Sequence, residues 1–242
     1  MNVLIKPINK ALNGTITAPA SKSYSHRVFI AAGLTNGISI VKNPLISGDV
    51  SITLAILKQF GVHIDRINSS DYSVKGINIH RIKVNEKIID CGNSGTSFRI
   101  FSALSLLVKG GLIFKGIFLK RKRPIIPLLD TLKDLGGRYE FKKDKLYIYR
   151  ESRKCDPKIK IRADLTSQFV TALLFLCPFI KCNNLTHIEV ETSTEIVSKP
   201  YIDITLEVLR KFQINIKEKI HGPNKRKYLI DLNQKFKPQL TF

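Results

Sequence analysis

Hydroxyl, amide and basic side chains gather at a few points of the chain, each at the start of an apolar run. They are Lys22, Ser23 and Arg27, then Asn93, Gly95 and Thr96, then Arg123, then Thr166, Ser167 and Gln168, and finally Ser198 and Tyr201. Helices are predicted to begin at these points, and the free N–H groups and positive dipole end of a helix start attract anions. Hydroxyl and amide groups donate to phosphate oxygens, Arg binds a carboxylate or phosphate through two hydrogen bonds, and Lys supplies a point charge. Together these residue types predict an anion site.

A structural interpretation competes with this one at each point. Ser, Thr and Asn at a helix start are most often plain N-caps. Gly95 fits either a tight turn or a close approach of backbone to ligand. Lys22 and Arg123 favour a bound anion more strongly, because a basic residue in the first turn opposes the helix dipole, although a solvated surface is the alternative for both. The recurrence of such residues at equivalent points of a repeat is what favours a site.

The repeat is seen at the ends of three predicted helices. They read AILKQFGVHI at 55–64, DTLKDLGGRY at 130–139 and EVLRKFQINI at 207–216, and their leucines at 57, 132 and 209 stand 75 and 77 residues apart. Gly61 and Gly136 follow the first two helices, where a left-handed C-cap is expected. An extended stretch comes next in all three copies, so the pattern indicates one supersecondary unit used three times.

A further apolar helix is predicted upstream in each copy, beginning near Ser21, near Asn93 and near Thr166. The second helix of the later copies is predicted to begin with a basic residue and then Pro, at 123–124 and 199–200, and Asp49 is expected to cap the corresponding helix of the first copy.

Short β-like runs complete the unit. ISIVK at 38–42, LIFKGI at 112–117 and HIEVE at 187–191 separate the paired helices, and paired extended runs follow the second helix. The unit is strand, helix, strand, helix, strand, strand. Because the helices are apolar nearly all round, we expect them inside and the sheets outside. The predicted fold class is α/β, an inside-out domain of three βαβαββ repeats.

The chain is strongly basic. Its 242 residues include 40 Lys and Arg against 19 Asp and Glu, a net charge of +21. This charge favours nucleic acid, acidic lipid or a phosphorylated small molecule as partner, although a general bias toward Lys, Asn and Ile explains part of it. The segment 210–237, with nine basic and two acidic residues, is a candidate nucleic-acid face. Aromatic residues are not interleaved there as a stacking platform requires.

Several classes are excluded. The longest apolar stretch, 169–180, contains Pro178 and is shorter than the ~20 residues of a membrane span, and the first residues do not read as a secretory signal. The four cysteines form no CxxC pair, so neither a zinc site nor a disulfide framework is predicted. The five histidines are scattered, and no metal or cofactor is expected. The chain is predicted to be cytoplasmic with reduced thiols.

Five strings are specific enough to indicate a family: SKSYSHR at 21–27, DCGNSGTSFR at 90–99, KRP at 122–124, TSQF at 166–169 and VSKPYIDIT at 197–205. In order and spacing they resemble 3-phosphoshikimate 1-carboxyvinyltransferase, the EPSP synthase family, over essentially the whole chain. The resemblance implies transfer of the enolpyruvyl group of phosphoenolpyruvate to the 5-hydroxyl of shikimate 3-phosphate. Phosphate leaves through a tetrahedral adduct, and no metal is required. Both substrates are anions.

The resemblance also implies residue roles. Shikimate 3-phosphate is expected on Lys22, Ser23, Arg27, Thr166, Ser167, Gln168, Ser198 and Tyr201. Phosphoenolpyruvate is expected on Lys22, Asn93, Gly95, Thr96, Arg123 and Gln168, with Lys22 as the catalytic residue. Ile100 stands where many members have Pro, which puts the geometry of the phosphoenolpyruvate pocket in question, and Thr166 replaces a Ser. Since Gly95 is retained, a complete enzyme containing this domain is expected to be a glyphosate target.

The length of the chain is its larger departure from the family pattern. Family members have a second, similar domain that carries the groups for acid/base catalysis. Residues 1–14 are expected to form a first strand and crossover of that other domain, 15–232 the three-repeat domain that binds shikimate 3-phosphate, and 233–242 the start of a second crossover. The partner implied is the C-terminal domain of the same enzyme, without which the chain is expected to be inactive. A related transferase acting on a UDP-sugar, an RNA-binding module and a structural remnant are the alternatives.

Overall fold

Three consecutive stretches of the chain repeat one order of elements, as the sequence predicts. The computed structural model describes residues 3–4, 6–78, 88–121 and 123–239. The first stretch comprises α1 (Lys22–Gly33), β1 (Ile38–Val41), α2 (Gly48–Gln59), β2 (His63–Arg66) and β3 (Tyr72–Lys75). The second comprises β4 (Ile88–Asp90), α3 (Gly95–Leu104), η2 (Ser105–Leu107), β5 (Leu112–Lys115), α4 (Ile117–Lys120), α5 (Ile126–Lys133), β6 (Gly137–Lys142) and β7 (Lys145–Arg150). The third comprises β8 (Lys158–Ile161), α6 (Gln168–Leu176), η3 (Cys177–Phe179), β9 (His187–Thr192), α7 (Lys199–Lys211), β10 (Ile216–Ile220) and β11 (Arg226–Asp231).

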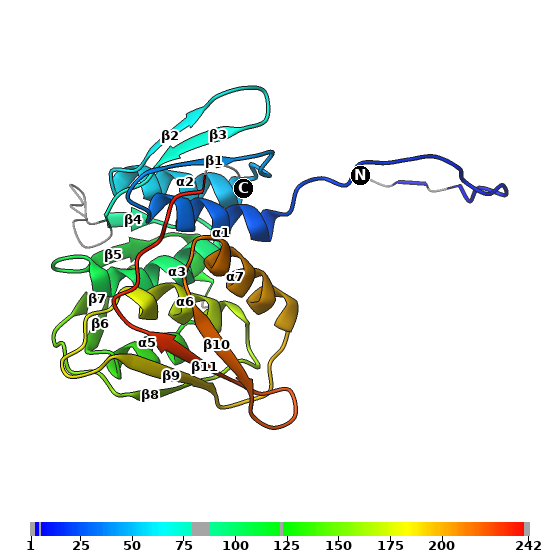
Figure 1. Ribbon diagram of the computed structural model, residues 1–242. Coiled ribbons are helices and arrows are strands. Elements are labelled where there is room, and N and C mark those ends of the chain that lie inside the picture. Colours follow the sequence, from blue (N-terminus) through cyan, green and yellow to red (C-terminus); the bar gives the residue numbers. More distant parts are fainter. Residues whose placement is uncertain (1–2, 5, 79–87, 122, 240–242) are drawn as a thin grey trace.

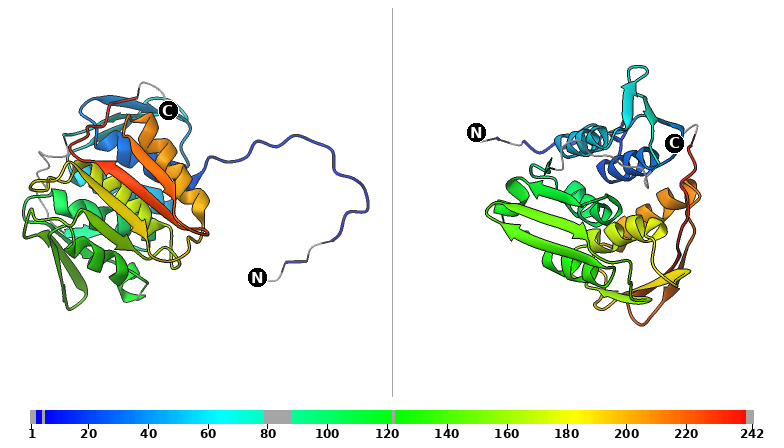
Figure 2. Two further views of the ribbon diagram at one scale, coloured as in Figure 1. Left: turned by 60° about the horizontal axis from the view of Figure 1, so that its bottom comes forward. Right: turned by 90° about the vertical axis from the view of Figure 1, so that its left-hand side faces the viewer.

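The helices lie inside and the sheets outside, which confirms the predicted arrangement (Figure 1). Residues 97–104 of α3 and 169–176 of α6 are all buried: α6 is apolar nearly all round, and α3 also buries Ser97, Arg99 and Ser102. Sheets flank the two helices, and α1, α2 and α7 pack beside them (Figure 2). The fold is therefore the inside-out α/β domain that the repeat indicates.

Each unit contributes one sheet, but the first sheet differs. The strand orders are β1-β3-β2, β4-β5-β7-β6 and β8-β9-β11-β10, with β4 parallel to β5 and β8 parallel to β9. The first unit lacks the parallel strand among the described residues, since 3–4 and 6–21 hold no helix or strand and leave the body of the fold (Figure 1). The strand predicted within 1–14 was assigned to another domain, and the described residues of that range form no strand in this chain. The free edge of β1 meets the end of the chain instead, where the Ile40 N–H donates to the Gln239 carbonyl at 3.0 Å.

The ends of the second helices show the repeat in the backbone. Gly61, Gly136 and Gln213 follow α2, α5 and α7 with φ of +93°, +77° and +63°. Their N–H groups donate to the carbonyls of Lys58, Lys133 and Arg210 at 2.9 Å. The first two confirm the predicted left-handed C-caps, and Gln213 adopts the same conformation without being a glycine.

Two predicted helix starts are wrong. The N-cap of α2 is Ser47, and Asp49 lies inside the first turn, where it pairs with Lys22 instead of capping the helix. Helix α5 begins at Ile126 with Pro127 in its first turn, so Pro124 lies outside the helix. Helix α7 does begin at Lys199 with Pro200, as predicted.

The predicted absence of a disulfide is also wrong, and so is the prediction that all four thiols are reduced. Cys155 and Cys182 form one, with their Cα atoms 5.7 Å apart. Cys155 follows β7 and Cys182 follows η3, and the fold brings these two connecting segments together. Spacing along the chain could not indicate this pair, because the contact is tertiary. Cys91 and Cys177 are free, and burial raises the pKa of both thiols.

The sequence also predicts that the chain has no membrane span and no metal site. None of the helices in the described ranges is both long and apolar enough to cross a membrane. No group of three His, Cys, Asp or Glu residues with metal-binding geometry occurs among the described residues.

Candidate functional site

The starts of the central helices converge, and hydrogen bonds between their first turns join them. Arg27 of α1 reaches α6 and α7, and Gln168 of α6 reaches α3. His26 of α1 reaches Thr53 of α2. The residues predicted from the sequence are therefore brought to one end of the domain, where several positive helix ends meet.

Arg27 is the most enclosed charged group of this region. It is 2% exposed, and its Nε donates to Thr205 Oγ1 at 2.7 Å. Nη1 donates to the Ser23 carbonyl at 2.9 Å, and Nη2 donates to Thr171 Oγ1 at 3.3 Å and the Tyr201 carbonyl at 3.1 Å. These bonds leave one N–H of Nη1 for a further acceptor. Burial lowers the pKa of Arg27 to about 10, yet the group stays charged at neutral pH.

A second buried arginine, Arg99 of α3, organises the other side of the site. Its Nη1 donates to Gln168 Oε1 at 2.5 Å, and its Nε and Nη2 both donate to the Pro124 carbonyl, at 3.2 and 2.8 Å. The amide of Gln168 then donates to Thr96 Oγ1 at 3.1 Å. Arg99 thus sets the orientation of one predicted site side chain and fixes the backbone beside another, Arg123.

Gly95 is the first residue of α3 and packs closely against two side chains. A Cβ on Gly95 would lie 3.0 Å from Phe118 Cε2 and 3.1 Å from Arg99 Nη1. Phe118 is itself buried and packs on Phe98 at a ring distance of 4.4 Å. The structure therefore explains Gly95 by close packing at the start of α3.

Arg99 and Arg123 share the Phe118 ring. Their Cζ atoms lie 5.0 and 5.6 Å from its centre. Burial and the nearby Arg123 charge lower the pKa of Arg99 to about 10. Two guanidinium groups on one ring repel each other, and an anion placed between them would relieve that repulsion.

His26 begins a buried chain of hydroxyl groups. His26 Nδ1 lies 2.7 Å from Thr53 Oγ1, which lies 2.8 Å from Ser97 Oγ, and Ser97 Oγ lies 2.7 Å from Ser94 Oγ. Ser94 is the N-cap of α3. This chain couples α1, α2 and the start of α3. Burial lowers the pKa of His26 to about 4, so its ring is neutral at neutral pH.

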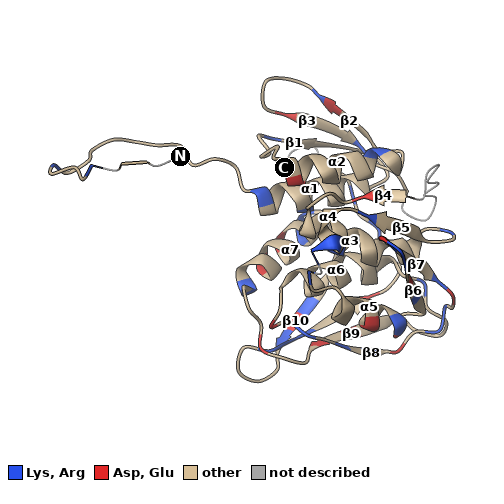
Figure 3. Ribbon diagram, turned by 180° about the vertical axis from the view of Figure 1, so that it is seen from behind, with Lys and Arg blue, Asp and Glu red and all other residues tan. Residues whose placement is uncertain are grey.

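The remaining predicted residues lie nearer the surface. Lys22 is exposed and bonds Asp49 Oδ2 at 3.1 Å, so a carboxylate already offsets its charge at the helix start. Asn93 is exposed, and its Oδ1 accepts from Arg121 Nη1 at 3.3 Å. Neighbouring Lys and Arg residues lie beside α3 and α4 (Figure 3).

The third unit supplies hydroxyl groups. Thr166 Oγ1 accepts from the Gln168 N–H at 3.2 Å, and Ser167 is the N-cap of α6. Ser198 precedes α7 with φ of +59°, and its carbonyl accepts from the Tyr201 N–H at 3.1 Å. The Tyr201 side chain is 45% exposed.

Sequence reasoning missed three residues of this region. Arg99 and Phe118 were overlooked although Arg99 belongs to the 90–99 string, because a charged residue on an apolar helix was the only signal available. Tyr24 was overlooked too. Its hydroxyl donates to Glu207 of α7 and ties that helix to α1.

The nucleic-acid alternative gains nothing from the structure. Three of the basic residues in 210–237 are paired with acidic neighbours. Arg226 lies 3.4 Å from Glu218, Lys227 lies 3.1 Å from Glu191, and Lys211 lies 3.8 Å from Glu207. Pairing of this kind reduces the charge available to a phosphate backbone.

Comparison with known proteins agrees with the geometry. The sequence model of the family described as EPSP synthase (3-phosphoshikimate 1-carboxyvinyltransferase) matches residues 6–235. Proteins named 3-phosphoshikimate 1-carboxyvinyltransferase from Methanococcus maripaludis and Methanocaldococcus jannaschii are 37% and 38% identical over 94% and 98% of this chain. A protein of that name from Clostridium perfringens is 31% identical over 98% of the chain.

A solved structure supports the fold. EPSP synthase from Acinetobacter baumannii superposes with a TM-score of 0.78 at 22% identity, over 97% of this chain and 50% of that one. The chain spans about half the length of the curated relatives it matches, 52% and 54% for the two methanogen proteins. On the family match and the converging helix starts together, this chain belongs to the EPSP synthase (3-phosphoshikimate 1-carboxyvinyltransferase) family.

Proposed function

We propose that this chain provides the shikimate 3-phosphate half of an enolpyruvyl transferase site. The full reaction moves the enolpyruvyl group of phosphoenolpyruvate to the 5-hydroxyl of shikimate 3-phosphate, giving 5-enolpyruvylshikimate 3-phosphate and phosphate. The observation that carries this proposal is the convergence of the starts of α1, α3, α6 and α7, joined through Arg27 and Gln168. Family membership supplies the chemical identity of the anions.

The roles proposed for individual residues follow their positions. Shikimate 3-phosphate binds the hydroxyl-rich side formed by α1, α6 and α7, with the residues Lys22, Ser23, Thr166, Ser167, Gln168, Ser198 and Tyr201. Arg27 lies beneath this side and offers a single N–H of Nη1. It therefore acts chiefly by fixing Ser23 and Tyr201, and its ligand contact is limited to that one N–H.

Phosphoenolpyruvate binds beside α3, where the two guanidinium groups face Phe118. The residues proposed for it are Lys22, Asn93, Gly95, Thr96, Arg123 and Gln168. Lys22 exchanges its Asp49 partner for the ligand, because the ion pair between Lys22 of α1 and Asp49 of α2 is exposed. Arg123 offers two parallel donors to a phosphate or carboxylate.

In this reaction, this half of the site positions the two substrates and neutralises their negative charges. The 5-hydroxyl group loses its proton to a base and its oxygen bonds to C2 of phosphoenolpyruvate while C3 gains a proton, which gives the tetrahedral adduct. The C2–O bond to phosphate then breaks and C3 loses a proton. Lys22 and Arg123 balance the phosphate and carboxylate charges through both steps, and the hydroxyl and amide donors hold the two substrates in line.

We place the acid/base groups in a partner domain. On this proposal 15–232 is the substrate domain, 1–14 and 233–242 connect it to the partner domain, and the protein works in the cytoplasm without a cofactor. Retention of Gly95 supports glyphosate as an inhibitor of the two-domain enzyme.

Calorimetric titration of shikimate 3-phosphate into the chain tests the proposal. We expect saturable binding and no steady turnover when phosphoenolpyruvate is added. Lys22→Ala should weaken binding about tenfold, because one charge-assisted contact is lost. Lys58→Ala is the matched control, since Lys58 is an exposed lysine in the last turn of α2. Equal affinities of the two variants, or turnover by a homogeneous preparation of the chain, would contradict the half-site.

A further inference from the structure

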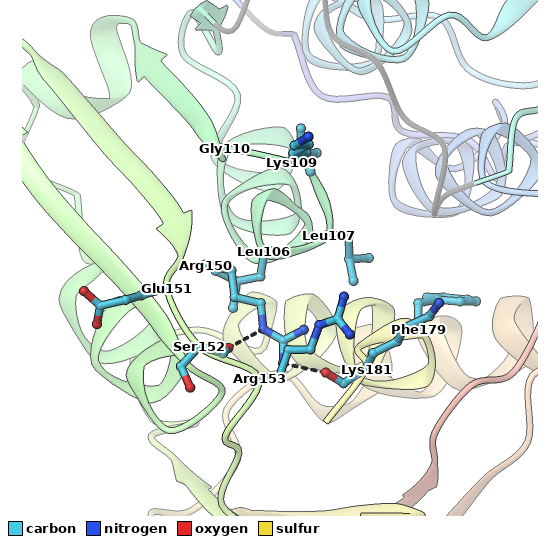
Figure 4. A pocket seen from close by; sticks show the side chains of 11 residues that line it. Leu106, Leu107, Lys109, Gly110, Arg150, Glu151, Ser152, Arg153, Phe179 and Lys181 are labelled. Carbon is cyan, nitrogen blue, oxygen red and sulfur yellow. Dashed lines mark hydrogen bonds between the residues drawn. The ribbon is translucent and has the colours of Figure 1, made fainter. Parts of the chain in front are cut away.

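A cavity of about 510 Å³ lies at the opposite end of the central helices from the proposed site. It opens where α3 passes into η2 and α6 passes into η3, so the length of a helix, about 15 Å for ten residues, separates it from the helix starts. Its wall carries four basic side chains, Lys109, Arg150, Arg153 and Lys181 (Figure 4). None of these residues belongs to the proposed transferase site.

The charges of this cavity are unbalanced. Glu151 is its one acidic lining residue, and that carboxylate bonds Arg138 Nε at 2.6 Å. Among the ion pairs of the described residues, none includes Lys109, Arg153 or Lys181. Like charges that converge on one cavity repel each other, and a bound anion would remove that cost.

Arg150 is part of the framework of the cavity. Its Nε donates to the Ser152 carbonyl at 2.9 Å, and its Nη2 donates to the Lys181 carbonyl at 2.8 Å (Figure 4). Burial and the neighbouring Arg153 charge lower the pKa of Arg150 to about 10. Arg150 thus holds in place the two segments that carry Arg153 and Lys181.

The disulfide fixes the same two segments. Cys155 and Cys182 each lie within two residues of a basic lining residue, and the Asn183 N–H donates to the Arg153 carbonyl at 3.0 Å. The backbone segments that carry Arg153 and Lys181 are therefore held in place before any ligand arrives. A preformed site binds more tightly because less conformational entropy is lost.

We propose that this cavity binds a small organic phosphate, independently of the transferase site. Lys109, Arg153 and Lys181 are exposed and free to bind the phosphate oxygens, and Arg153 offers two parallel donors. Leu107 is half-buried in the lining of the same cavity and offers an apolar contact to the organic part, whereas Phe179 is 1% exposed and packs on Phe236 behind it. Three cations match a ligand with two or more negative charges, such as a nucleoside diphosphate.

The test is calorimetric titration of ADP and of inorganic pyrophosphate into the full chain at fixed salt concentration. We expect ADP to bind once per chain and more tightly than pyrophosphate. The variant K109Q/R153Q/K181Q should lose at least tenfold in affinity for ADP. The control R210Q/K217Q/K219Q removes the same charge from exposed positions of α7 and β10, and should change the affinity less than twofold.

Three results would overturn the proposal. Equal losses in both triple variants would mean that ADP responds only to the general positive field of the protein. Pyrophosphate affinity equal to that of ADP would mean that the organic part of the ligand makes no contact with Leu107. Saturation with shikimate 3-phosphate should leave ADP binding intact, whereas competition between the two would place ADP in the transferase site.

Discussion

Two buried arginines, Arg27 and Arg99, sit on the two sides of the helix-start site and use their guanidinium groups differently. Both donate to a carbonyl beside the start of another helix, Tyr201 for Arg27 and Pro124 for Arg99. Arg27 donates its other hydrogen bonds to the side chains of Thr205 and Thr171 and to the Ser23 carbonyl. Arg99 instead bonds the Gln168 side chain and lies over two aromatic rings.

The difference separates two tasks. The partners of Arg27 are backbone groups and short side chains of three packed helices, so it stabilises their packing. The partners of Arg99 include a side chain proposed to touch substrate, so it positions part of the site. Substitutions of each arginine and of its neighbours therefore test the packing role and the positioning role separately.

The largest loss of stability is expected for Arg27→Met. The substitution keeps an apolar stem but leaves buried carbonyl and hydroxyl groups without their donor. We expect the free energy of unfolding to fall by about 3 to 5 kcal/mol, the range for breaking a buried charged network. Urea denaturation measures this, with exposed Arg210→Met as the control. A loss below about 1 kcal/mol would mean that Arg27 does not stabilise the helix packing.

His26, the residue before Arg27, predicts a pH effect on the same side. Its folded-state pKa of about 4 lies below the ordinary value of 6.5. Only the unfolded chain takes up this proton between those values, so stability is fully present above pH 6.5 and falls as the pH drops toward 4. The loss attributable to His26 is at most about 3 kcal/mol. His26→Asn should flatten the stability profile between these pH values, and His63→Asn, at an exposed position, should leave it unchanged.

Much of this architecture could be predicted because it depends on local pattern. The repeat of helix ends gave the three units, and the residues at helix starts gave the groups that converge. The Cys155–Cys182 pair and the enclosure of Arg27 depend on segments far apart in sequence, so spacing could not indicate them. The hydrogen bond of Gln239 with Ile40 of β1 joins segments 199 residues apart and could not be predicted for the same reason. Arg99 was missed because a buried charge is identified only when its partners are known.

Arg99→Met tests the positioning side. We expect a smaller loss of stability, about 2 kcal/mol, because its acceptors lie at the edge of the site and Arg99 is 7% exposed. Affinity for shikimate 3-phosphate should drop about tenfold, because Gln168 loses the donor that orients it. Arg99→Lys should not restore affinity, since one ammonium group cannot bond Gln168 and the Pro124 carbonyl in the same geometry. Full affinity in Arg99→Lys would show that charge alone matters here.

The smallest effect on stability is expected at Gly95, and the fold offers a matched control. Gly95 and Gly48 are the first residues of α3 and α2, and the Cβ of an alanine at 48 would meet nothing within 4 Å. At 95 the same atom meets Phe118 and Arg99, and Phe118 cannot yield easily because it is enclosed. We expect Gly95→Ala to lower the free energy of unfolding by about 1 kcal/mol, and Gly48→Ala to leave it unchanged or raise it slightly.

Gly95→Ala should also affect ligand binding, because the added methyl group pushes directly on Arg99. It should weaken shikimate 3-phosphate binding, as Arg99→Met does. The double variant Gly95→Ala with Arg99→Met should lose less binding free energy than the two single variants lose together. Both substitutions act through the orientation of Gln168, so their effects overlap. Full additivity would place the effect of Gly95 on the ligand itself and remove Arg99 as the intermediary.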